Sequence, residues 1–192
     1  MRTPPEGISA VPPLKPGTMD LSPASRDPMR LPAPFSLIII IIIVALLLDL
    51  LPWSGVALIA HPDFVLLALL YWAVHEPHTV GQGWGFALGL IMDVADSALL
   101  GQHAMVYVVA IFLAQLLRVR MLQLSVAEQA LHIVAILAVS QGIGVLLNLA
   151  MGRDFPGFSI LISLVLGALL WPIINAIATI PRLRSRSSRV VG

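Results

Sequence analysis

Asp93 and Asp96 are the residues best placed for chemistry, because both lie within a long apolar stretch, residues 81–99. Acidic side chains inside membrane spans commonly serve as proton or cation relays. Their three-residue spacing would put both carboxylates on nearby faces of one helix. No Lys or Arg occurs between Arg30 and Arg118, so we expect no basic partner for either acid. The alternative, which we favour, makes Asp93 a hydrogen-bonded structural acid and Asp96 a residue at the outer, water-facing end of the helix.

The five histidines give weaker signals of chemistry. In the segment His75-Glu76-Pro77-His78, the proline interrupts the i, i+4 helical spacing that a metal-binding pair needs, so we interpret it as a polar cytoplasmic turn. His61, His103 and His132 are isolated in the sequence. The sequence also lacks cysteine and the GxSxG and HExxH motifs. We therefore predict no catalytic residue, no metal site and no cofactor, in a protein that is not an enzyme.

Small residues recur at four-residue spacing in two apolar stretches. Such a row forms a ridge without bulky side chains, along which another helix backbone can approach closely. We therefore interpret both rows as helix-packing surfaces, and contact between the two stretches is one natural pairing. The first row is Gly81, Gly85, Gly89 and Asp93, and the second is Ser159, Ser163, Gly167, Trp171 and Asn175.

The composition indicates a membrane protein. Of the 192 residues, 58% are hydrophobic and only 11% are charged, with a mean hydropathy of +0.95. Soluble domains carry about 25% charged residues, so this supply could not cover a water-facing surface. The composition therefore excludes most soluble enzymes and predicts an all-α polytopic membrane helical bundle.

About six transmembrane helices can be placed along the chain, with five as the main competing count. Pro62 is expected in the first turn of the short second span, where its missing N–H costs little. Ser125 and Glu128 form a capping-box pattern at the start of the fifth span. Pro181 is expected to end the sixth span. The predicted spans cover residues 35–51, 62–74, 81–99, 103–117, 126–151 and 158–180.

Basic residues predict the orientation and the domain boundaries. With six spans and the N-terminus inside, ten of the eleven Lys and Arg residues are cytoplasmic, and only Arg153 lies outside. Residues 1–34 carry nine prolines and no apolar periodicity, which predicts a disordered cytoplasmic tail. Residues 35–181 form the predicted transmembrane domain, and residues 182–192 a basic cytoplasmic tail. We expect residues 1–28 to be dispensable, because Met29 precedes Arg30 and the first span.

Several short motifs, taken in order, resemble the rod shape-determining protein MreD family. The resemblance covers most of residues 35–186, and it depends on the order and spacing of the motifs, none of which is decisive alone. The matching motifs are Pro62-Asp63, Tyr71-Trp72, Pro77-His78, Gly85-Phe86, Gly89-Leu90, Asp93, Leu100-Gly101 and the run Gly167-Ala168-Leu169-Leu170-Trp171-Pro172. The candidate helix-packing or partner-binding positions are Tyr71, Trp72, Gly81, Gly85, Gly89, Asp93, Gly101, Ser163, Gly167, Trp171 and Pro172.

The resemblance implies a multi-pass protein of the bacterial inner membrane that takes part in cell elongation without catalysis. It implies MreC as a direct partner and, through MreC, the MreB filament, the RodA glycosyltransferase and the elongation transpeptidase. Membrane lipids are the other expected partners, and no nucleic acid is expected. The family fold is similar to the substrate-binding subunits of energy-coupling-factor transporters. The long proline-rich N-terminal tail departs from the family pattern.

Two classes of function remain open from the sequence. A membrane scaffold for peptidoglycan synthesis agrees with the resemblance and with the lack of catalytic motifs. A small-molecule binding or transport component agrees with the fold analogy and with the intramembrane Asp93. A fold analogy alone does not transfer ligand binding.

Overall fold

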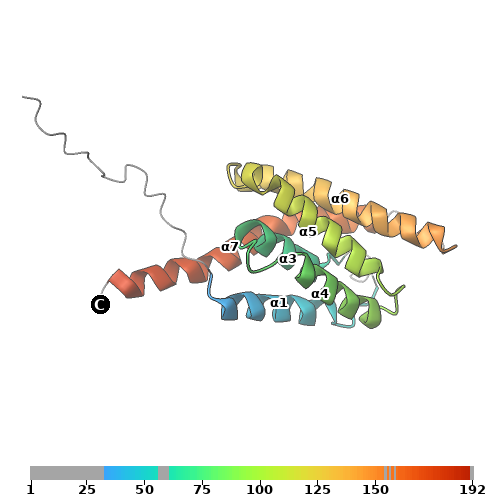
Figure 1. Ribbon diagram of the computed structural model, residues 1–192, viewed down its shortest axis with the longest axis horizontal. Helices are drawn as coiled ribbons and strands as arrows, with labels where there is room; N and C mark the ends of the chain where they lie inside the picture. The colour runs from blue at the N-terminus through green and yellow to red at the C-terminus, as the bar shows by residue number, and fades with distance from the viewer. Residues whose placement is uncertain (1–32, 56–60, 154, 156, 158, 191–192) are drawn as a thin grey trace, which may run out of the picture. The chain divides into compact units, whose positions relative to one another are not determined.

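The computed structural model describes residues 33–55, 61–153, 155, 157 and 159–190, and every regular element in this part of the chain is an α-helix. This confirms the all-α prediction. The helices belong to one unit of the chain, residues 32–192. They are α1 (Phe35–Asp49), α3 (Phe64–His75), α4 (Gln82–Ala95), α5 (Gln102–Met121), α6 (Val126–Ala150) and α7 (Ser159–Val190) (Figure 1).

Three helices are long and apolar enough to cross a membrane: α5, α6 and the part of α7 from Ile160 to Thr179. The other three are shorter, with 15, 12 and 14 residues in α1, α3 and α4. A 12-residue helix is about 18 Å long, well under the roughly 30 Å of a hydrocarbon core. The chain is therefore a helical membrane protein, and the count of six spans stays a prediction.

Helix α3 is the centre of the packing. Every side chain from Val65 to Val74 is buried, and the helix packs against α1, α4, α5 and α7. A helix that is apolar on all sides is buried either in protein or in a membrane, and here the neighbouring helices bury it. Among the buried side chains are Tyr71 and Trp72, and the ring of Tyr71 lies 6.2 Å from that of the equally buried Trp171 of α7. Because protein surrounds α3, its length need not match the bilayer.

Several predicted helix boundaries agree with the structure. Ser125 and Glu128 form the predicted capping box. Helix α3 ends at His75, one residue later than predicted and at the first residue of the predicted polar turn. Helix α3 begins at Phe64, two residues later than predicted, because the Asp63 side chain caps it and Pro62 lies before the cap. The short segment expected before this helix includes residues 56–60, which lie outside the described residues.

The prediction that Pro181 ends the last helix is wrong. Helix α7 continues to Val190, with Pro172 and Pro181 both inside it. A proline removes its own backbone hydrogen bond and crowds the preceding turn, but the residues on either side can keep their bonds. The backbone of the predicted basic tail, residues 182–190, is therefore helical.

The two rows of small residues do not pack against each other, so that pairing is wrong. A Cβ atom at Gly85 would lie 2.6 Å from Ile111 Cδ1, and one at Gly89 would overlap the backbone of Ala104, so both glycines face α5. Gly167 instead faces α6 and α3. A Cβ atom there would lie 3.0 Å from Leu137 Cδ1 of α6 and 3.7 Å from Leu67 Cδ2 of α3.

Four other predicted packing positions do not lie where two helix backbones approach each other closely. Gly81 is the N-cap of α4, and a Cβ atom there would meet open space. Ser163 is half-buried and Pro172 is exposed. Gly101 is the N-cap of α5, and its φ of +97° is the left-handed conformation that glycine adopts without strain.

We predict that Gly89→Ala destabilises the protein by about 1–3 kcal/mol, because the new methyl group would force α4 away from the α5 backbone. Gly83→Ala is the matched control on the same helix, since its Cβ would enter open space. It should be neutral or slightly stabilising. Thermal unfolding of both variants in detergent measures the difference. Equal melting temperatures for the two variants would refute the close contact.

Candidate functional site

The start of α3 is capped by a carboxylate from the end of α1. The backbone N–H groups of Phe64 and Val65 donate to Asp49 Oδ1 and Oδ2, at 3.1 and 2.8 Å. Asp49 is the last residue of α1 and is buried. Each helix begins with several backbone N–H groups that have no partner within the helix, and a negative charge there is favoured by the helix dipole. Asp49 therefore joins two consecutive helices through backbone hydrogen bonds.

Asp63 completes the same cap and links it to α5. Its Oδ1 accepts the backbone N–H of Leu66 at 2.7 Å and the hydroxyl of Tyr107 at 2.8 Å. Tyr107 lies fully buried on α5. Sequence reasoning missed both Asp49 and Tyr107 as site residues. Asp49 could have been identified from the sequence, because it is the single strongly polar residue in the first apolar stretch, residues 35–51.

Asp93 repeats this arrangement between α4 and α5. Its Oδ2 accepts the backbone N–H of Gly101 at 2.7 Å, and its Oδ1 accepts that of His103, also at 2.7 Å. Asp93 is 1% exposed, whereas the Asp96 side chain is 51% exposed at the C-cap of α4. The predicted position of Asp96 at the helix end is confirmed, and that this end faces water stays a prediction.

Among the described residues no Lys or Arg pairs with either acid, as expected, but the interpretation of His103 as isolated is wrong. The ring atom Nδ1 of His103 lies 3.0 Å from Asp93 Oδ1, and Nε2 lies 3.6 Å from Asp96 Oδ2. His103 is in the first turn of α5, and the turn from Ser97 to Gly101 folds it back onto the end of α4. In the sequence His103 seemed isolated, because ten residues separate it from Asp93.

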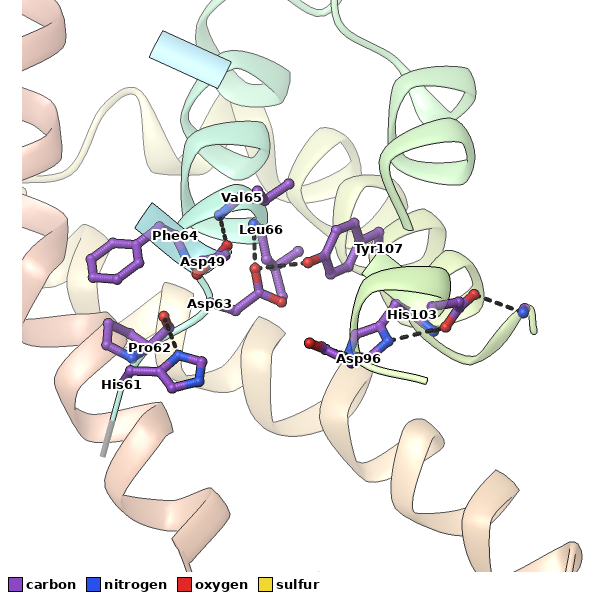
Figure 2. A network of polar contacts seen from close by, with 12 residues as sticks. Asp49, His61, Pro62, Asp63, Phe64, Val65, Leu66, Asp96, His103 and Tyr107 are labelled. Atoms are coloured by element: carbon purple, nitrogen blue, oxygen red, sulfur yellow. Dashed lines mark hydrogen bonds and ion pairs between the residues drawn. The ribbon is translucent and has the colours of Figure 1, made fainter. Parts of the chain in front are cut away.

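These side chains gather at one end of the helices (Figure 2). We call Asp49, Asp63, Asp93, Asp96, His103 and Tyr107 the aspartate cluster. They come from α1, α4, α5 and the residue before α3. Figure 2 shows the Tyr107 hydroxyl pointing at Asp63, and His103 near Asp96. The other ring nitrogen of His103 contacts Asp93. No Lys or Arg lies between Arg30 and Arg118, so backbone N–H groups, His103 and the tyrosine face these acids.

The hydrogen bonds of the cluster favour a structural role for Asp93. Both of its oxygen atoms accept backbone N–H groups, as both oxygen atoms of Asp49 do. Within the described residues, no group of three or more His, Asp or Glu side chains is arranged to hold a metal ion. The chemistry that this geometry supports directly is helix capping, which fixes where α3 and α5 begin.

At the other end of the helices, away from the aspartate cluster, two further sets of hydrogen bonds connect neighbouring helices. Gln129 Oε1 of α6 accepts hydrogen bonds from Trp171 Nε1 at 3.2 Å and Asn175 Nδ2 at 3.4 Å, both on α7. Arg118 Nε of α5 donates to the backbone oxygen of Val74 at 2.7 Å, at the end of α3. Of the predicted packing positions, Trp171 belongs to the first of these sets, Asp93 belongs to the aspartate cluster, and the backbone N–H of Gly101 donates to Asp93.

Comparisons with known proteins give a consistent result. The family model described as rod shape-determining protein MreD matches residues 29–179. A protein named rod shape-determining protein MreD from Haemophilus influenzae is 28% identical over 130 residues, which are 68% of this chain and 80% of that protein. No solved structure matches the chain.

We predict that Asp93→Ala costs more stability than Asp93→Asn, since the amide oxygen of asparagine can still accept one of the two backbone N–H groups. Loss of a helix cap costs about 0.5–2 kcal/mol. Asp96→Ala, at the exposed acid three residues away, is the matched control and should cost least. Unfolding of the three variants in detergent gives the order. An Asp96→Ala variant as unstable as Asp93→Ala would contradict the capping role of Asp93.

Proposed function

The chain belongs to the rod shape-determining protein MreD family, and from this premise we propose that it is a non-catalytic scaffold of the cell-elongation machinery in the bacterial inner membrane. The match over residues 29–179 carries the proposal, because it extends from before α1 to the apolar part of α7. A role in cell shape follows from the family itself. The scaffold role in peptidoglycan synthesis is the further step that we propose.

We propose that the scaffold binds MreC directly and, through it, connects to MreB, RodA and the elongation transpeptidase. The absence of catalysis is supported by how the described acids are used: Asp49 and Asp93 cap helices, and Asp63 both caps α3 and accepts the Tyr107 hydroxyl. Among the motif positions, Gly81 and Pro172 are not enclosed by other helices, so they are candidates for a partner contact.

We propose that both termini are cytoplasmic, as tails of residues 1–34 and 182–192 on either side of a membrane domain. The contacts between helix ends support this orientation. Ala33 N donates to Glu76 Oε1, before α1 and after α3, and Arg118 near the end of α5 reaches Val74. A six-span topology with the N-terminus inside puts all these ends on the cytoplasmic side. The same topology puts the aspartate cluster at the outer side.

Depletion and complementation in a rod-shaped bacterium test the proposal. Depletion should produce round cells, and the chain fused after Gly192 to a protein that fluoresces only in the cytoplasm should restore fluorescent rods. A chain that begins at Met29 should restore rods equally well, because the family match begins there. Co-purification of MreC with the restoring chain measures the proposed partner.

Cells that stay rod-shaped after depletion would contradict the proposed function. Restored rods without fluorescence would contradict the orientation, and restored rods without MreC in the purified sample would contradict the partner. A chain from Met29 that reaches the membrane but leaves the cells round would show that residues 1–28 are needed.

A further inference from the structure

Helix α7 is longer than a membrane span requires. Its apolar part, Ile160–Thr179, has 20 residues and is therefore about 30 Å long, which matches the thickness of a hydrocarbon core. The helical backbone then continues to Val190, about 16 Å further along the axis. Figure 1 shows this last part of α7 running past the other helices. We call residues 180–190 the α7 extension.

The sequence of the α7 extension is strongly basic. It contains four arginines, whereas residues 155–192 contain no Asp or Glu. Arg182, Arg186 and Arg189 are spaced by four and three residues, which places these positions on one side of the helix. The fourth is Arg184. No acid within α7 itself can neutralise this charge.

Contacts with α3 and α6 fix the point at which the extension begins. Asn175 Nδ2 donates to Gln129 Oε1 of α6 at 3.4 Å. One turn later, the Thr179 hydroxyl lies 3.4 Å from the hydroxyl of Tyr71 on α3. Thr179 is the last residue of the apolar part. The extension therefore leaves the packed helices at the end where α3 stops and α6 starts.

The other charges at this end of the helices do not cancel those of the extension. Among the described residues, the acids at this end are Glu76 and Glu128, and each accepts hydrogen bonds within the chain. Glu76 accepts the backbone N–H of Ala33, and Glu128 accepts the N–H and the hydroxyl of Ser125. The last turn of α5 adds two further arginines. Arginines therefore outnumber the described acids here.

We propose that the α7 extension binds the headgroups of anionic phospholipids, such as phosphatidylglycerol, at the membrane surface where α7 emerges. Anionic headgroups attract basic residues that lie close to the surface. The proposal needs only that α7 crosses a bilayer, so it holds whichever side of the membrane this end faces.

The position of the arginines along the axis favours lipid over an acidic protein. The headgroup layer on each side of the core is about 5–8 Å thick. The backbone at residues 182 and 184 lies about 4–8 Å past Thr179, and residues 186 and 189 lie about 10–15 Å past it. The first two positions are therefore within the headgroup layer, and the other two are within about one Debye length of it.

The absence of cysteine from the chain allows one fluorophore to be attached at a chosen depth. The full-length Ile177→Cys chain is labelled and placed in phosphatidylcholine vesicles with a small fraction of lipid that carries a nitroxide quencher near its headgroup. We expect quenching by nitroxide-labelled phosphatidylglycerol to be about two- to fivefold stronger than by nitroxide-labelled phosphatidylcholine. Leu161→Cys is the matched control, because it is also exposed on α7 but near the other end of the apolar part. There the two lipids should quench equally.

Substitution of the two arginines within the headgroup layer tests their charge. Arg182→Gln together with Arg184→Gln should lower the preference for phosphatidylglycerol at Ile177→Cys about twofold or more, whereas lysine at both positions should keep it. Arg153→Gln, just after the far end of α6, should leave it unchanged. Salt at about 1 M, where the Debye length is about 3 Å, should remove most of the preference in the chain with all its arginines.

Equal quenching by the two lipids at Ile177→Cys would overturn the proposal and would favour an acidic protein as the partner of the extension. An equal preference at Leu161→Cys, or an unchanged preference after the glutamine substitutions, would also overturn it, because the lipid would then be bound elsewhere. Loss of the preference in the lysine variant would contradict binding by charge. Restoration of rod shape is scored separately, so failure of lipid binding leaves the proposed function standing.

Discussion

The structure depends on the pairing of buried carboxylates with the backbone N–H groups at the starts of α3 and α5. The first N–H groups of a helix have no partner within it, and in a membrane protein water does not supply one. Three of these groups in α3 bond to Asp49 and Asp63. At the start of α5, the N–H groups of the N-cap residue Gly101 and of His103 bond to Asp93. These acceptors stabilise the start of the 12-residue helix α3, whose first backbone N–H groups would otherwise lack partners.

The same acids determine how consecutive helices are joined. Asp49 and Asp93 each lie at the end of one helix and cap the next, so the α1–α3 and α4–α5 connections are fixed by the same device. The Tyr107 hydroxyl on Asp63 then ties the two capped starts together. For a proposed scaffold, this arrangement uses polar groups to hold a fixed shape, which a binding partner can recognise without any chemical step.

The sequence predicted the helical class, the capping box at Ser125 and the close contact of Gly85 and Gly89, because these depend on composition or on local spacing. It did not identify α5 as the partner of those glycines, since a periodic row does not say which helix faces it. The pairs Asp49–Val65 and Asp93–His103 were missed because their members are 16 and 10 positions apart in the sequence, and helical spacing does not predict which residues meet across a connection. The prediction that the last helix ends at Pro181 was wrong, because a helix can continue past a proline when the neighbouring residues keep their hydrogen bonds.

Hydrogen exchange of the first turn of α3 tests the capping account most directly. In the Asp49→Ala variant, peptides that cover residues 64–70 should exchange about fivefold faster than in the unaltered chain, the effect of losing a cap worth about 1 kcal/mol. Peptides from the middle of α6, which Asp49 does not contact, should exchange at the same rate in both proteins. Unchanged exchange at the start of α3 in the Asp49→Ala protein would contradict the account.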